Sequence, residues 1–145
     1  MLGISPAAEG RNIDFDWTGL YVSPVFVLQS VDQCAADGLV VSSYDLRLIE
    51  ILGEAKYYLG KNNGALEQFQ RYVANAPESG SRVGAAYYFM GEIYIRQARY
   101  QHADISLSAA VKKEPLLDRW WTRLGYAREM AGNYYEVQEI PVDCT

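Results

Sequence analysis

The chain has 145 residues, of which half are apolar and 21% are charged, a balance that is ordinary for a soluble protein of one domain. Its formal net charge of −5 argues against nucleic acid as a partner, because surfaces that bind phosphates carry a basic excess. No run of about 18 apolar residues occurs, so we expect no membrane span.

The first ten residues lack the basic start and the apolar core of a signal peptide. We therefore expect a cytoplasmic protein, unless the chain is a processed fragment. Cys34 and Cys144 are far apart and form no CxxC pair. Two idle thiols are the simplest interpretation, and a disulfide that ties the two ends together is the alternative.

Residues 1–41 are predicted to form an N-terminal arm with one helix. Residues 1 to 22 show neither a strand nor a helix period, so we expect an irregular arm whose aromatic side chains dock on the rest of the chain or on a partner. Ser23 and Pro24 predict a helix start and Gly38 its end. The apolar stripe of that helix would comprise Val25, Phe26, Leu28, Val31 and Cys34. The alternative is an edge strand over residues 21–28.

From Ser43 onward the helical period is strong. After a first helix, residues 60–63 are expected to form a turn, and further helices are predicted over 65–76, 81–97 and 101–113. A helix over 118–131 follows, with Asp118 as its cap. Pro141 falls where another helix would continue, so a final helix is expected only over about residues 134–140.

One stretch fixes the register of these helices. Tyr87 to Tyr94 includes Gly91 and is followed at fixed intervals by Ala103, Leu107, Ala110 and Pro115. Corresponding places upstream are taken by Ile49, Leu52, Gly53, Ala65, Phe69 and Pro77, and downstream by Trp121, Leu124 and Gly125. With this pattern the chain resembles a tetratricopeptide repeat (TPR) protein.

The resemblance implies an all-α fold, a short TPR helical-hairpin superhelix of about two and a half repeats. The repeats would cover about 46–79, 84–117 and, in part, 118–141, within a TPR domain over 42–145. In each hairpin we expect the glycine to lie against a small residue of the next helix, which pairs Gly53, Gly91 and Gly125 with Ala65, Ala103 and Val137.

The incomplete third repeat would leave apolar surface in water, because solenoid ends normally carry a polar capping helix. We expect a C-terminal docking surface there, which a partner, a second copy of the chain or the N-terminal arm would cover. Its residues would be Trp120, Trp121 and Leu124.

The family implies a concave groove built by the first helix of each repeat, and therefore a protein partner. The groove residues would be Arg47, Glu50, Glu54, Tyr57, Ala85, Tyr88, Glu92, Ile95, Arg119, Thr122, Tyr126 and Glu129. Because Glu54 and Glu92 would repel an acidic peptide, a basic or tyrosine-accepting segment is favoured. Glu92 is also expected to pair with Arg96, four residues later on the same helix.

These observations favour a non-enzymatic adaptor or assembly subunit of a larger complex. The sequence holds no catalytic motif, and we expect no metal and no other cofactor. Two alternatives stay open. One is a chaperone similar to the small TPR chaperones of type III secretion, and the other is a TPR fragment of a multidomain enzyme.

Overall fold

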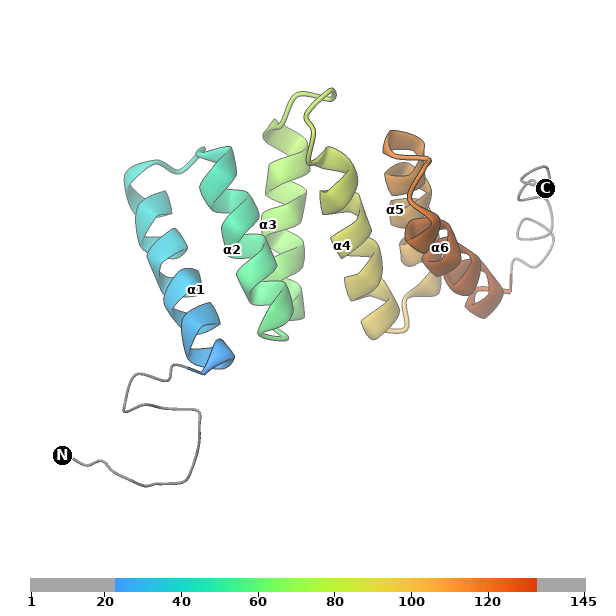
Figure 1. Ribbon diagram of the computed structural model, residues 1–145, viewed down its shortest axis with the longest axis horizontal. Helices are drawn as coiled ribbons and strands as arrows, with labels where there is room; N and C mark the ends of the chain where they lie inside the picture. Colours follow the sequence, from blue (N-terminus) through green and yellow to red (C-terminus); the bar gives the residue numbers. More distant parts are fainter. Residues whose placement is uncertain (1–22, 133–145) are drawn as a thin grey trace, which may run out of the picture.

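The computed structural model describes residues 23–132, and within that range the chain forms six helices and no strand. Figure 1 shows the helices side by side in one row, joined by turns at alternate ends. Their bounds are α1 (Pro24–Val41), α2 (Leu46–Tyr58), α3 (Asn62–Asn75), α4 (Val83–Arg96), α5 (Tyr100–Lys113) and α6 (Asp118–Met130). The predicted all-α class is confirmed.

Helix α1 begins where the sequence predicts, but it continues further. The Oγ of Ser23 accepts a hydrogen bond from the backbone N–H of Phe26 at 3.1 Å and so caps the first turn. The predicted end at Gly38 is wrong, and so is the alternative strand, because the helix runs to Val41. Gly38 serves packing instead, since a Cβ there would lie 2.7 Å from Cδ1 of Leu48 on α2. The missing side chain lets the two helices approach each other.

The buried face of α1 also differs from the predicted stripe. It consists of Asp32, Ala35 and Leu39. Of the predicted stripe, Phe26 is 60% exposed, and Val25 and Cys34 are exposed as well. Within residues 23–132, α1 packs against α2 and against no other helix, so only a narrow face of it is covered.

Several other boundaries differ from the predictions by a few residues. Helix α3 starts at Asn62, inside the predicted turn, because Gly60 adopts a left-handed backbone (φ 79°) and reverses the chain within a short distance. Asp118 is the first residue of α6 and does not cap it; Leu117 holds the cap position without a side-chain hydrogen bond. The arm over residues 1–22, the helix predicted over 134–140 and Cys144 lie outside the described residues.

Gly53 and Gly91 mark the close approach of paired helices, as expected, but the atoms nearest to them do not belong to the predicted alanines. A Cβ at Gly53 would lie 3.0 Å from Cε1 of Phe69, and one at Gly91 would lie 2.5 Å from Cγ of Leu107. Both partners lie one turn beyond the predicted alanines. Long side chains in a helix lean back toward its N-terminus, so the residue one turn later reaches the level of the glycine. Val137, the expected partner of Gly125, is outside the described residues.

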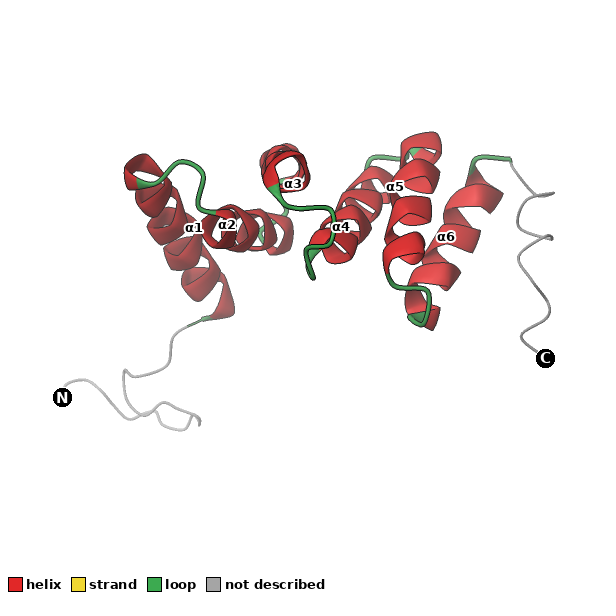
Figure 2. Ribbon diagram, turned by 90° about the horizontal axis from the view of Figure 1, so that it is seen from above, coloured by secondary structure: helices red, strands yellow, loops and turns green. Residues whose placement is uncertain are grey.

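The row of helices is curved, with α2, α4 and α6 on the inner side. Each helix contacts the next, and in addition α2 contacts α4 and α4 contacts α6, while α3 and α5 do not meet within the described range. Figure 2 shows α3 set to one side of α2 and α4. Because helices on the inside of a bend are crowded together, these contacts place the concave face on α2, α4 and α6.

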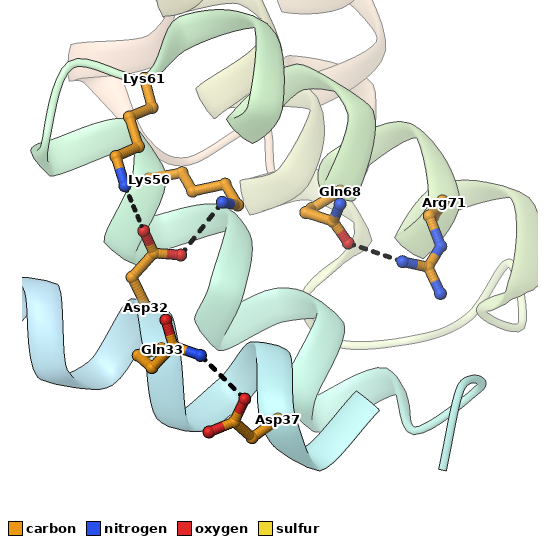
Figure 3. A network of polar contacts seen from close by, with 7 residues as sticks. All are labelled: Asp32, Gln33, Asp37, Lys56, Lys61, Gln68 and Arg71. Carbon is orange, nitrogen blue, oxygen red and sulfur yellow. Dashed lines mark hydrogen bonds and ion pairs between the residues drawn. The ribbon is translucent and has the colours of Figure 1, made fainter. Parts of the chain in front are cut away.

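Asp32 ties α1 to the beginning of the row. One carboxylate oxygen lies 3.0 Å from Nζ of Lys56 on α2, and the other lies 2.6 Å from Nζ of Lys61, just before α3 (Figure 3). Burial alone would raise the pKa of Asp32. The hydrogen bonds and positive charges of Lys61 and Lys56 outweigh that effect, so the pKa lies below its ordinary value of 3.8.

We expect Gly91→Ala to lower the free energy of unfolding by about 1–3 kcal/mol, because the added methyl group would overlap Leu107, which is fully buried and has no room to move. Gly125→Ala is the matched control. Apart from its chain neighbours and the backbone of its own helix, no described atom lies within 4 Å of its Cβ position, and alanine is the better helix former by about 0.5–1 kcal/mol. Urea denaturation followed by circular dichroism measures both changes. Equal losses in the two variants would contradict the close approach at Gly91.

Asp32→Asn should destabilise the protein by about 1–3 kcal/mol at neutral pH, because it leaves two lysines facing an uncharged amide. Since the folded-state pKa of Asp32 is depressed, its contribution is complete above the unfolded value of 3.8 and is lost as the pH falls through the folded-state pKa. The gap between wild type and variant should therefore narrow below pH 3.8. Thermal denaturation over a pH series measures it, with Asp37→Asn as an exposed control on the same helix. A gap that stays constant into acid would contradict the ion-pair assignment.

Candidate protein-binding surface

The predicted groove residues recur at regular spacings on α2, α4 and α6, which places them on one face of each helix. Those are the three helices on the concave side. The structure joins some of these residues by direct contacts between helices and leaves others exposed and separate.

Arg82, directly before α4, connects α4 to two glutamates of α2. Its Nε donates to Glu50, and its Nη2 donates to Oε2 of Glu54 at 2.8 Å. Burial raises the pKa of Glu54, and the charge of Arg82 opposes that rise. The hydrogen bond to Glu50 raises the pKa of Arg82, which keeps the guanidinium charged. One guanidinium therefore holds both carboxylates of α2 and offsets one of their two negative charges.

Tyr57 is held between α2 and α4. The guanidinium of Arg96 lies 3.8 Å from the centre of its ring, and the ring of Phe89 packs edge-on against it at 4.9 Å. Nη1 of Arg96 also donates to the backbone oxygen of Tyr57 at 3.0 Å. Burial raises the pKa of Tyr57. The tyrosine is fixed in the wall of the groove by these contacts.

Glu92 connects α4 to α6. It accepts a hydrogen bond from Oη of Tyr88 at 3.1 Å and one from Nε of Arg123 at 2.7 Å. The predicted pair of Glu92 with Arg96 is wrong, because Arg123 on the neighbouring helix takes the carboxylate while Arg96 lies over Tyr57. Burial first, and the charge of Glu92 second, raise the pKa of Tyr88.

The remaining predicted groove residues are not joined to one another. Ile95 is half-buried on α4, and Ala85 packs against the core. Thr122 donates to the backbone oxygen of Asp118 at 3.2 Å, a bond within its own helix. The members exposed to solvent are Arg47, Arg119, Thr122, Tyr126 and Glu129.

The predicted C-terminal docking surface is not an uncovered apolar patch. Trp120 is only 8% exposed and stacks on Tyr88, with 5.1 Å between ring centres, and Leu124 is 1% exposed. Trp121 is half-buried, and its Nε1 donates to the backbone oxygen of Pro115 at 2.9 Å. The prediction was wrong for Trp120 and Leu124 because α6 packs these side chains into the core it shares with α4 and α5.

Two arginines that organise the concave face were missing from the predicted set. Arg82 lies one turn before Ala85 in the groove register, and Arg123 lies next to Thr122. Helical spacing alone would have suggested Arg82. Neither pairing was predictable, because each arginine contacts the first helix of the preceding repeat. Arg82 contacts α2, and Arg123 contacts α4. The wall is therefore less acidic than its composition indicates, since Glu50, Glu54 and Glu92 all carry arginine partners.

Among residues 23–132 no group of three or more His, Cys, Asp or Glu side chains is placed to hold a metal ion. Over the same range, no helix combines the length and the apolar character needed to cross a bilayer.

Comparison with known proteins identifies the type of fold. No protein-family model matches the chain, and no curated protein matches it. Solved structures do. A crystal structure of MamA protein matches with a TM-score of 0.69 and 20% identity over 77% of this chain and 59% of the MamA chain. A second MamA structure matches with a TM-score of 0.68 and 17% identity over 83% of this chain and 71% of that one.

MamA is a TPR-type protein, so these likenesses confirm that the present chain has a TPR-type fold, as the sequence pattern indicated. The chain spans 59% of the first MamA structure.

Proposed function

We propose that this chain is a non-enzymatic adaptor or assembly subunit that holds a segment of a protein partner on its concave face. The observation that carries the proposal is the continuous wall of α2, α4 and α6. Its polar groups are fixed by contacts between the helices, namely Arg82 with Glu54 and Arg123 with Glu92. A surface that is already ordered loses little conformational entropy when it binds, which favours recognition.

The wall also presents tyrosine in a form suited to binding. Tyr126 on α6 is 40% exposed, and one side of its ring is supported by the guanidinium of Arg123 at 5.3 Å. Tyrosine and arginine are the residue types that most often dominate the energy of protein interfaces, because they supply large contact areas and hydrogen-bonding groups together. Tyr126 is therefore the side chain on which we expect a partner segment to depend most.

The burial of Trp120 and Leu124 favours the concave face over the other version of this function, permanent docking through the C-terminal end. That version depended on uncovered apolar side chains on α6. Since Trp120 and Leu124 already pack into the core, neither is available to a permanent neighbour.

Tyr126→Ala should weaken binding of the partner by more than about 1 kcal/mol, or about fivefold or more in Kd, if Tyr126 is an interface hot spot. The tagged full chain would capture partners from a lysate of its source organism, and calorimetry with the purified partner would then measure affinity. Ile105→Ala is the matched control, because Ile105 is 71% exposed on α5, away from the concave wall. An affinity that is unchanged by Tyr126→Ala but reduced by Ile105→Ala would contradict the proposal.

A further inference from the structure

Helix α1 stands at one end of the row (Figure 1) and holds the place of a second helix. It packs against α2 as α3 packs against α4 and as α5 packs against α6. A shift of 34 residues brings its last residue, Val41, onto Asn75 at the end of α3, and a shift of 72 brings it onto Lys113 at the end of α5. Within residues 23–132, however, no first helix precedes α1, so one side of it has no neighbour.

The side of α1 without a neighbour is one that α3 and α5 bury. The four positions that are buried in both of those helices correspond in α1 to Val31, Cys34, Ala35 and Gly38. Among these four, α1 buries Ala35 alone. Cys34 is exposed, although its counterparts Gln68 and Ser106 are only 6% and 5% exposed. Cys34 therefore lies where a first helix would cover it in the other two hairpins.

This side of α1 is also apolar. We call Val27, Val31, Cys34 and Val41 the open stripe, since their spacing of four, three and seven residues places them on one face of the helix. Val27 is 47% exposed and Val41 is 90% exposed, whereas the corresponding positions of the other two hairpins hold lysine, arginine or asparagine. Solenoid ends normally present a polar face to water. We therefore expect another segment to cover the open stripe.

The residues before α1 carry the spacing of a first helix. Gly19 lies 34 residues before Gly53, the same distance that separates Gly91 from Gly125. Phe15, four residues before Gly19, holds the place that in the three described first helices is taken by Ile49, Tyr87 and Trp121. This correspondence could be recognised only from the structure, because it depends on α1 being a second helix.

The spacing between the two helices of this hairpin agrees as well. In both described hairpins the side chain nearest to the glycine comes 16 residues later. Sixteen residues after Gly19 is Ala35, which is smaller than the phenylalanine and the leucine of those hairpins. Val31, one turn earlier, is larger than the alanines at its corresponding positions. Val31 and Ala35 together are therefore close in volume to the alanine and leucine of α5, with the larger side chain moved by one turn.

A segment of the same chain fits the open stripe better than a second molecule. Residue 22 directly precedes Ser23, the cap of α1, so residues 12–22 are held beside the stripe and dock without the entropy cost of association. With 18 residues, α1 is about 27 Å long and about 10 Å wide, which gives it a face of roughly 270 Å². A stable interface between separate molecules needs about 800 Å² on each partner.

We propose that residues 12–22 pack against the open stripe as the first helix of a further repeat, with Gly19 facing α1. Aspartate, threonine and glycine are poor helix formers, so this segment depends on α1 for its order. It extends the row of first helices formed by α2, α4 and α6 by one member at the N-terminal end. Its contact with α1 does not depend on what the concave face binds.

The thiol of Cys34 reports on this contact. The chain has two cysteines, so Cys144→Ser leaves Cys34 as its one thiol. The rate at which dithiobis(nitrobenzoic acid) modifies Cys34 would be measured in the folded full chain and in urea. We expect modification of the folded chain to be slower by about tenfold or more, because the segment must move away before the reagent reaches the thiol.

Gly19→Glu in this background should raise the rate of modification of the folded chain by about fivefold or more, because a charge between the two helices prevents their contact. Gly10→Glu is the matched control, since Gly10 lies outside residues 12–22, and it should leave the rate within about twofold. Phe15→Ala removes apolar contact without adding charge and should raise the rate by about threefold or more. Circular dichroism checks that each variant keeps its helices, and Phe15→Ala decides the outcome if Gly19→Glu does not fold.

Three results would overturn the inference. The first is modification of Cys34 in the folded chain as fast as in urea. The second is a slow rate that neither Gly19→Glu nor Phe15→Ala raises, or that Gly10→Glu raises equally. The third is a rate that falls as the protein concentration rises, which would show that a second copy of the chain covers the open stripe. None of these results alters the effect expected of Tyr126→Ala, so the proposed function is tested separately.

Discussion

Two arginines that each contact the first helix of the preceding repeat determine how charge is distributed on the concave face. Arg82 holds Glu50 and Glu54 of α2, and Arg123 holds Glu92 of α4. Each pair joins two helices that are adjacent on the inside of the curve, and each removes a negative charge from the wall. The same contacts therefore link the inner helices and offset part of the negative charge of the wall.

Apolar packing and these ion pairs contribute differently to the stability of the fold. Partly exposed ion pairs contribute only about 0–1 kcal/mol each to stability. Apolar contacts stabilise the fold more, through the insertion of Leu107 over Gly91, the stacking of Phe69 on Phe89 with 5.1 Å between ring centres, and that of Trp120 on Tyr88. A core of this kind holds the helices together whatever the surface charge. The arginines therefore affect the binding surface more than they affect the stability of the protein.

Structural features that depend on residues close together along the chain were predictable from the sequence. The cap at Ser23 and the close approach at Gly91 follow from local spacing, and both are present. Contacts between helices that are distant in sequence could not be predicted, because they depend on how the helices pack. The pairing of Arg123 with Glu92 and the burial of Trp120 belong to this class. The negative charge of the wall is partly offset by arginines from the next repeat, so the charge of this surface can be judged only from the structure.

A double-mutant cycle on Glu92 and Arg123 tests this account most directly. The free energy of unfolding would be measured by urea denaturation for wild type, Glu92→Gln, Arg123→Gln and the double variant. We expect a favourable coupling of about 1 kcal/mol between the two side chains, as for a hydrogen-bonded ion pair with one half-buried partner. Strictly additive losses would show that Arg123 does not hold Glu92, and the ion-paired wall between α4 and α6 would have to be abandoned.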